Sequence, residues 1–281
     1  MGGSVVTSLG LLTECEIDRF VVRTFFVSAT RTTRRMSNAH VRSIQVGTPD
    51  SHGTADATDP MEQPWWTSFY KDRVEGALFL DETNLDGDEQ ADLKHHGGPE
   101  KAVCVYPAEH YSYWDDELDL DLGPAAFGEN FTITGLTERE ACIGDSYDIG
   151  EATVQITQPR SPCWKLARRW RTKDLAARFE ETGYTGWYLR VLETGTVAPG
   201  QSMTLVDRPN PDWSVARATK VRYRMPDDRE LAGELAAIDA LGESWTDKLS
   251  HRAETGEQVY STARVIGPNA DADADANSPN Q

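Results

Sequence analysis

A single cysteine flanked by cations offers the clearest chemistry in this chain of 281 residues. Cys163 follows Pro162 in the segment Gln-Pro-Arg-Ser-Pro-Cys-Trp-Lys-Leu, with Arg160 before it and Lys165 after it. Nearby positive charge and the start of a helix both favour the thiolate, the form of cysteine that attacks electrophiles and binds metals. A structural thiol buried at a strand-to-helix turn would fit the same residues, so this pattern alone leaves both interpretations open.

A second cluster combines two adjacent histidines with two adjacent glycines, His95-His96-Gly97-Gly98. Neighbouring histidine side chains diverge, so the pair is poorly arranged to bind one metal ion. Without a Cβ atom, Gly97 and Gly98 allow the backbone to approach a ligand closely, and they equally suit a tight turn. Both interpretations remain open from the residues alone.

A third cluster, Glu129-Asn130, lies between Phe127 and Phe131 at the start of an apolar run. These polar side chains could orient a ligand at the edge of a strand. They could equally satisfy buried polar groups where a loop enters that strand.

The elements expected to position these clusters are mostly short strands. Residues 40–46 alternate apolar and polar side chains, which is typical of a strand. Closely spaced short strands favour a sandwich or barrel over alternating strand–helix units, so we expect a mainly β, barrel-like fold. The polar segment 84–99 is long enough to be a functional loop. Further short strands are expected at residues 101–106, 130–133, 141–143 and 153–157.

The pattern changes to helical spacing directly after Cys163. Leu166 and Trp170 lie one turn apart, and residues 185–192 are compatible with a further helical turn. Three short amphipathic helices follow the proline-rich joint at residues 209–211, with Asp212, the region of Asp228 and Ser244 as their expected starts. Because so few residues bury little surface alone, we expect these helices to dock on the barrel.

Four segments are expected along the chain. Residues 1–35 form a leader that is either disordered or precedes a natural start at Met36, where the sign of the charge changes. Residues 36–208 form the β-barrel domain and residues 209–255 the three-helix domain. Residues 256–281 form a disordered acidic tail. The candidate chemistry therefore falls within the barrel domain.

The composition excludes several classes of protein. Asp and Glu number 46 against 28 Lys and Arg, and a net charge of −18 repels nucleic-acid backbones. No run approaches the roughly 20 apolar residues that span a membrane. No C-x-x-C pair occurs, and Cys104 and Cys142 lie in apolar runs that predict small buried side chains. We expect a cytoplasmic protein with reduced thiols that binds neither nucleic acid nor membrane.

Taken in order, these clusters resemble the MOSC family, named for the C-terminal domain of molybdenum cofactor sulfurases, and within it the stand-alone YiiM-like branch. The resemblance covers about residues 39–252 and includes a small three-helix domain after the barrel. The second histidine, His95, departs from the family pattern. The matching pieces are Gly87-Asp88, Ala91-Asp92, His96-Gly97-Gly98-Pro99, Lys101-Ala102-Val103, Tyr106-Pro107, His110-Tyr111, Phe127-Gly128-Glu129-Asn130, Gly135-Leu136, Ile143-Gly144-Asp145, Pro159-Arg160, Pro162-Cys163-Trp164-Lys165-Leu166, Gly186-Trp187-Tyr188-Leu189-Arg190-Val191 and Ala198-Pro199-Gly200.

The resemblance implies a MOSC-type β-barrel with peripheral helices and a site for molybdenum cofactor. The cysteine of the family's Pro-Cys motif corresponds to Cys163, which is therefore implied as the catalytic residue and the ligand to the metal or its sulfur. Cations and backbone amides would hold the cofactor phosphate, and Glu129 and Asn130 would hydrogen-bond the pterin edge. The implied cofactor-binding residues are His96, Gly97, Gly98, Lys101, Glu129, Asn130, Arg160 and Lys165.

The resemblance also implies a reaction, the two-electron reduction of small N-hydroxylated compounds such as 6-hydroxylaminopurine to amines, as a detoxification. Since the sequence has no iron–sulfur or flavin pattern, the electrons would come from a separate reductase. Pyridoxal phosphate binding is a further association at the level of the family. Two alternatives remain: a module that carries cofactor or sulfur on Cys163 without turnover, and a barrel with only a structural or adaptor role.

Overall fold

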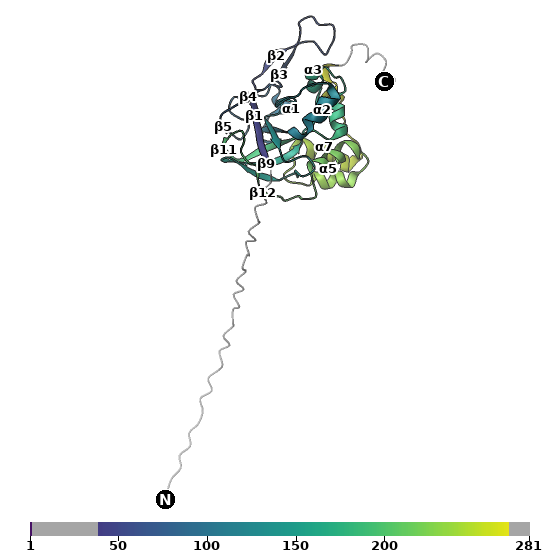
Figure 1. Cartoon of the computed structure of the whole chain (residues 1–281). Coiled ribbons are helices and arrows are strands. Elements are labelled where there is room, and N and C mark those ends of the chain that lie inside the picture. Colours follow the sequence, from purple (N-terminus) through teal and green to yellow (C-terminus); the bar gives the residue numbers. More distant parts are fainter. Residues whose placement is uncertain (2–38, 270–281) are drawn as a thin grey trace. The chain divides into compact units, whose positions relative to one another are not determined.

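The computed structural model of the chain describes Met1 and residues 39–269 (Figure 1). The predicted leader, residues 1–35, lies outside the described residues apart from Met1, and so does the part of the predicted tail at residues 270–281. The described strands are β1 His40–Val46, β2 Asp50–His52, β3 Trp65–Thr67, β4 Asp72–Val74, β5 Leu78–Leu80, β6 Val103–Pro107, β7 Phe131–Thr134, β8 Ser146–Ile149, β9 Ala152–Pro159, β10 Trp187–Glu193, β11 Gly195–Val197 and β12 Thr204–Asp207.

Most of the helices follow strand β7 in the sequence. The described α-helices are α1 Leu93–His96, α2 Tyr111–Leu118, α3 Trp164–Trp170, α4 Leu175–Thr182, α5 Val215–Arg224, α6 Arg229–Ala236, α7 Glu243–Thr255 and α8 Thr262–Val265. Three short 3₁₀ helices accompany them: η1 Pro99–Lys101, η2 Ala108–His110 and η3 Gly267–Asn269.

One large mixed sheet organises the protein as a curled half-barrel. Its strand order is β12-β8-β9-β10-β6-β7-β1-β4, and two small two-stranded sheets, β11-β5 and β2-β3, accompany it. The pair β6–β7 is parallel, whereas the other pairs of the large sheet are antiparallel. Backbone hydrogen bonds from Gly200 and Met203 to Val41 and Ala39 bring the segment before β12 back against β1. The predicted mainly β, barrel-like fold is confirmed.

Two sequence predictions within the barrel are wrong. Residues 185–192, predicted as a helical turn, contain most of strand β10, which pairs with both β6 and β9. The aromatic side chains Trp187 and Tyr188 bury well on a pleated surface, and this tertiary pairing overrides the local helical spacing. Residues 141–143 form no strand and contribute one isolated bridge, between Cys142 and Ser214.

The aromatic side chains of the helices after β6 and β9 form a second core beside the sheet. Trp114 of α2 stacks on Phe179 of α4 with ring centroids 4.4 Å apart, and Phe127 meets Phe179 edge to face at 4.9 Å. Leu166 of α3 is fully buried in the same cluster. Because α3 starts directly after Cys163, this packing fixes the element on which the cysteine sits.

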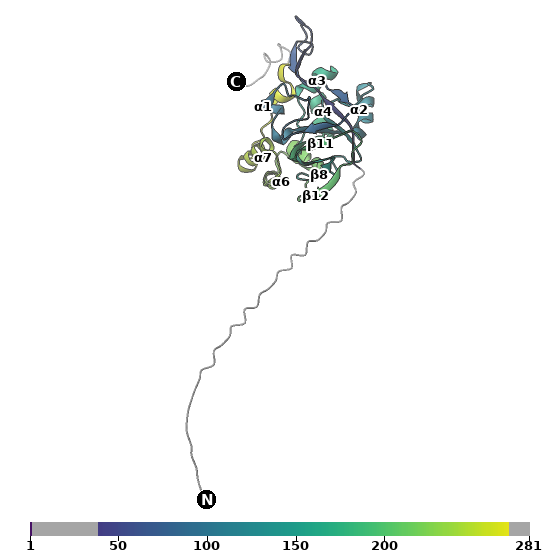
Figure 2. The same cartoon turned by 90° about the vertical axis from the view of Figure 1, so that its left-hand side faces the viewer.

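The three C-terminal helices pack on the sheet and share its main hydrophobic core. Figures 1 and 2 show α5, α6 and α7 grouped on one side of the strands. Val215, Leu235 and Trp245 belong to the same buried cluster as the barrel residues, so the predicted docking is confirmed. The caps differ in part from those predicted: Asp228 does cap α6, whereas Ser214 caps α5 and α7 starts after Gly242.

The segment after α7 corrects the prediction of a disordered tail from residue 256. Residues 262–265 form α8, and Arg264 makes an ion pair of 2.5 Å with Glu180 of α4. Asn269 Nδ2 donates a hydrogen bond of 3.0 Å to Trp164 O, and Asn269 Oδ1 accepts one of 2.7 Å from Arg168 Nε. Buried polar pairing, rather than apolar content, holds this stretch against α3.

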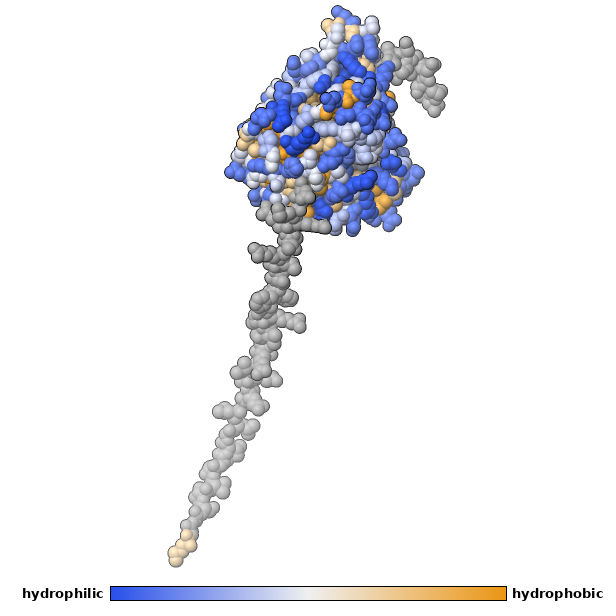
Figure 3. Space-filling view, in the orientation of Figure 1, coloured by the Kyte–Doolittle hydropathy of each residue, from blue (hydrophilic) through white to orange (hydrophobic). Residues whose placement is uncertain are grey.

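The face of the protein in Figure 3 is as hydrophilic as the charged composition predicts. The face in Figure 3 is mostly hydrophilic, with apolar residues scattered among polar ones. Among the described residues, no helix combines the length and the apolar character needed to cross a membrane.

Gly186, at the turn into the central strand β10, provides a test of how tightly the start of this strand is packed. Its φ is +66°, and an added Cβ would lie 2.1 Å from Val105 O, whereas Gly183 has a φ of +75° and no atom within 4 Å of an added Cβ. We expect Gly183→Ala to lower the free energy of unfolding by about 1 kcal/mol, the cost of the left-handed backbone alone. Gly186→Ala should cost about 3 kcal/mol, because overpacking adds to that strain. Urea denaturation of both variants measures the difference, and equal losses would contradict this account.

Candidate functional site

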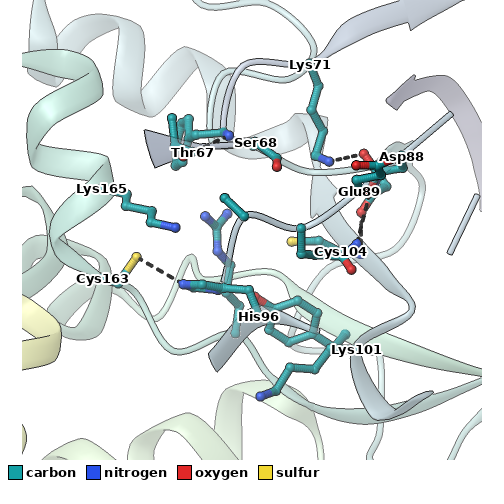
Figure 4. A pocket seen from close by; sticks show the side chains of 17 residues that line it. Thr67, Ser68, Lys71, Asp88, Glu89, His96, Lys101, Cys104, Cys163 and Lys165 are labelled. Carbon is teal, nitrogen blue, oxygen red and sulfur yellow. Dashed lines mark hydrogen bonds and ion pairs between the residues drawn. The ribbon is translucent and has the colours of Figure 1, made fainter. Parts of the chain in front are cut away.

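The turn between β9 and α3 places Cys163 at the wall of a pocket (Figure 4). Strand β9 ends at Pro159, and Cys163 occupies the position before α3 with an extended backbone, φ −133° and ψ 169°. The turn is held from both sides. Arg160 N donates to Gly186 O at 3.0 Å, and Pro162 O accepts a hydrogen bond from Arg264 Nη1. The cysteine is 6% exposed, so its reach is limited to this pocket.

The Cys163 pocket brings together residues that are far apart in the sequence. It is an open cavity lined by both polar and apolar residues, which is typical of small-molecule sites. Six of the predicted site residues line it: His96, Lys101, Asn130, Arg160, Cys163 and Lys165.

Two of the lining cations have no counter-charge. Arg160 is 6% exposed, its guanidinium forms no ion pair with a described carboxylate, and its Nη1 is buried without a hydrogen-bond acceptor. Lys165 is 9% exposed, and within the described chain its contact is the ring of Trp164, 6.0 Å from Nζ. A buried charge without a partner is costly, so these two groups make the pocket strongly attractive to an anion.

The other two lining cations are already engaged. Lys71 forms an ion pair with the buried Asp88, and Lys101 Nζ donates to His95 O at 2.9 Å. Burial lowers the pKa of Lys101. These lysines add positive potential to the wall, whereas Arg160 and Lys165 offer donors that are free to bind a ligand.

His96 lies beside the cysteine as a neutral imidazole. Its Nε2 is 4.0 Å from Cys163 Sγ, and Figure 4 shows the ring, the sulfur and the Lys165 amine directed into the same space. Burial, followed by the charges of Lys165 and Arg160, lowers the pKa of His96 to about 3. At neutral pH this ring therefore adds a polar group to the wall and no positive charge.

The paired glycines shape the pocket without lining it. Gly97 ends α1, and Gly98 has a φ of +97°, a left-handed backbone that favours glycine. Gly98 O accepts from Lys101 N at 2.9 Å, which closes the turn into η1. Of the two sequence interpretations, the structure places the tight turn here, and it sets the positions of His96 and Lys101.

Glu129 lies outside the Cys163 pocket, contrary to the expectation that it contacts a ligand. Its fully buried carboxylate accepts hydrogen bonds from the backbone N of Ala125 at 2.9 Å and of Phe127 at 3.0 Å, and from the hydroxyl of Tyr111. The neighbouring Asn130 does line the pocket, but its Oδ1 accepts from Cys104 N at 3.1 Å and its Nδ2 donates to Gln45 O. Both residues hold the pocket wall together.

Several lining residues carried no sequence signal of their own. Cys104 and Tyr188 pair across β6 and β10, and both face the pocket. Burial, first of all, raises the pKa of each, so both keep their protons. Cys104 had been predicted only as a small buried residue, which it is. Lys71 lies in a loop without such a signal, whereas Asp88 belongs to a piece of the family resemblance, and both line this pocket.

The donor set favours a ligand that combines negative charge with a soft atom. A buried thiol lies beside two uncompensated cations, and a thiolate is a soft metal ligand. Among the described residues, no group of three or more His, Cys, Asp and Glu side chains is placed to hold a metal ion. The chemistry of the pocket is therefore that of two thiols, Cys163 and Cys104, beside an anion-binding wall.

Comparison with known proteins agrees with this architecture in both parts of the chain. The family model described as MOSC domain matches residues 92–204, and the model described as YiiM-like, 3-alpha helix domain matches residues 213–256. The chain is 46% identical over 179 residues to the uncharacterized protein YflK of Bacillus subtilis, covering 64% of this chain and 81% of that protein. It is 40% identical over 201 residues to protein YiiM of Escherichia coli, covering 70% and 89%.

A fungal protein and two crystal structures extend the comparison. A protein named reductase from Gibberella moniliformis is 38% identical over 161 residues, which are 55% of this chain and 28% of that protein. The structure of YiiM from Geobacillus stearothermophilus matches with a TM-score of 0.64 and 32% identity, covering 76% of this chain and 99% of that one. YiiM from Escherichia coli matches with a TM-score of 0.64 and 36% identity, covering 70% and 94%. The chain therefore belongs to the MOSC domain family, in the YiiM-like group that carries a three-helix domain after the barrel.

Proposed function

We propose that the Cys163 pocket binds molybdenum cofactor and that the holoprotein reduces small N-hydroxylated compounds to amines. The observation that carries this proposal is the position of a buried thiol beside the uncompensated charges of Arg160 and Lys165. The cofactor combines a soft metal centre with an anionic phosphate, so it suits both halves of this donor set.

The residues of the pocket divide the binding task. Cys163 Sγ would be the one protein ligand to the metal, and the remaining ligands would come from the cofactor itself. Arg160 and Lys165 would donate charge-assisted hydrogen bonds to the phosphate, which offsets the cost of burying their charges. The mainly apolar sheet behind them excludes bulk water and strengthens these contacts.

The reaction requires two electrons and two protons for each N–O bond broken: R–NHOH gives R–NH₂ and water. When bound, the cofactor supplies the two-electron redox chemistry of its metal. Tyr188 keeps its phenolic proton because burial raises its pKa, so its hydroxyl can donate a hydrogen bond to the departing oxygen.

The electrons are proposed to come from a separate reductase. No C-x-x-C pair or flavin fingerprint occurs in the sequence, so a resident electron-transfer group has no recognisable motif here. The fungal relative named reductase, which matches over part of its length, supports a reductive role. We place this reaction in the cytoplasm, where the pocket thiols Cys104 and Cys163 would stay reduced.

Replacing Cys163 tests the metal ligand directly. Protein purified from a host that makes the cofactor should contain about one molybdenum per chain, and Cys163→Ala should lose it, because the thiolate is the proposed single protein ligand. Cys142→Ala is the matched control, since this buried cysteine lies away from the pocket against Glu140 O and Pro211 O. Mass-spectrometric metal analysis reports both variants. Full metal content in Cys163→Ala would refute the assignment.

The charge of Lys165 should contribute to cofactor retention rather than to folding. Lys165→Gln removes a charge-assisted contact worth about 1.5–3 kcal/mol, so the cofactor should bind roughly tenfold to a hundredfold more weakly. The control Lys220→Gln removes the same charge from an exposed position on α5. Pterin fluorescence released from the purified variants measures retention. Equal retention in the two variants would show that Lys165 makes no contact with the cofactor.

Turnover separates the enzyme from the carrier module. Holoprotein supplied with a chemical reductant should convert 6-hydroxylaminopurine to adenine, and Cys163→Ala should abolish the conversion, as followed by chromatography. The apoprotein is the control for direct reduction by the reagent. Bound molybdenum without conversion, together with a persulfide on Cys163, would favour the carrier.

A further inference from the structure

A second basic pocket lies in the helical part of the protein, and it shares no lining residue with the Cys163 pocket. It is formed by α5, α7 and the segment that leads into α8. We call it the helical pocket. The lining residues that matter here are Arg222, Lys248, Arg252, Tyr260, Ser261 and Arg264.

Arg222 is the most isolated cation of the helical pocket. It is 8% exposed, and its Nε is buried without a hydrogen-bond acceptor. Within the described chain its guanidinium contacts only aromatic rings, with Cζ 4.9 Å from the ring centroid of Trp245 and 5.4 Å from that of Tyr223. Ring contacts do not replace the hydrogen bonds that a buried guanidinium loses, so this side chain is left with donors to offer.

Lys248 adds a second positive charge to the helical pocket. It lies on α7, faces the pocket and forms no hydrogen bond or ion pair with a described residue. Burial, followed by the charges of Arg222, Arg264 and Lys101, lowers the pKa of Lys248 to about 8. Two unpartnered cations that repel one another are thus held in one cavity, an arrangement that an anion would stabilise.

The remaining two arginines are used by the fold and still add positive charge. Arg252 is 2% exposed and donates to the last carbonyls of α5, Arg222 O at 3.1 Å and Val221 O at 2.9 Å. Arg264 is paired with Glu180. Because Arg252 covers the carbonyl end of α5, the negative end of that helix is screened from the cavity.

The lining has an unusual charge balance for this protein. The chain carries a net charge of −18, yet the described lining of the helical pocket holds four cations and no carboxylate. Ser261 and Tyr260 add hydroxyl groups at the mouth. Cations and hydroxyls around a small cavity are the donors that recognise a phosphate group.

We propose that the helical pocket is a second ligand site, which binds a phosphate group through Arg222 and Lys248. The group can belong to inorganic phosphate or to a small phosphate monoester. The cations of this site differ from those that line the Cys163 pocket, although Arg264 also donates to Pro162 O beside Cys163.

Calorimetric titration of the full-length protein with inorganic phosphate tests the site. Arg222→Gln should weaken binding about tenfold or more, since a charge-assisted contact is lost. Arg224→Gln is the matched control: it removes the same charge two residues later on α5, from an exposed side chain that donates to Glu181 O. The control should keep the affinity of the wild type.

Two further variants test whether the phosphate binds in the helical pocket or in the Cys163 pocket. Lys248→Gln should also weaken phosphate binding about tenfold, while raising the melting temperature of the ligand-free protein by removing a repulsion. Lys165→Gln alters only the Cys163 pocket, so the phosphate binding that depends on Arg222 should persist in it. A parallel titration with phenyl phosphate distinguishes the source: tighter binding assigns a monoester, and weaker binding assigns free phosphate. Absence of phosphate binding in the wild type, or equal losses in Arg222→Gln and Arg224→Gln, would overturn the proposal.

Discussion

Two buried cations without a counter-charge, Arg160 and Lys165, impose the constraint on which the rest of the site depends. In a low-dielectric interior each would favour collapse of the wall or entry of a neighbouring carboxylate. The fold prevents both. Asp88 is occupied by Lys71, and the buried Glu129 is turned into the loop before β7. Asp88 and Glu129 are thus engaged elsewhere. Glu89, which also lines the pocket, is exposed and forms no ion pair with Arg160 or Lys165 among the described residues, so the pocket keeps its attraction for an anion.

Cys163 stays beside these cations because hydrogen bonds from elements remote in sequence hold the backbone before it. Gly186, at the entry to β10, accepts from Arg160 N, while Tyr223 from α5 donates to Ser161 Oγ at 3.0 Å. Arg264, from the segment beyond α7, donates to Pro162 O. The three-helix domain and the segment after it therefore form part of the site's support, and they do more than cover the sheet.

The residues around Cys163 could be predicted from their local chemistry, and His96, Lys101 and Asn130 from the family resemblance, whereas Cys104 and Tyr188 could not. Cys163, Arg160 and Lys165 lie within six residues, so their proximity follows from the chain itself. Cys104 and Tyr188 meet through strand pairing, and no local pattern encodes that register. The error at residues 185–192 has the same origin, because pairing on both sides decides the conformation of a short apolar run.

The acidic net charge of the chain and the cations in its two cavities act on different anionic ligands. Charges on the surface act over about 8 Å at physiological salt, so a net charge of −18 disfavours large polyanions before they make contact. Inside the cavities screening is weaker, and cations such as Arg160 and Arg222 dominate the local potential. We therefore expect small anions that enter a cavity to interact strongly with its cations, and large polyanions to meet the acidic surface first. The charge balance therefore selects by the size of the ligand as well as by its sign.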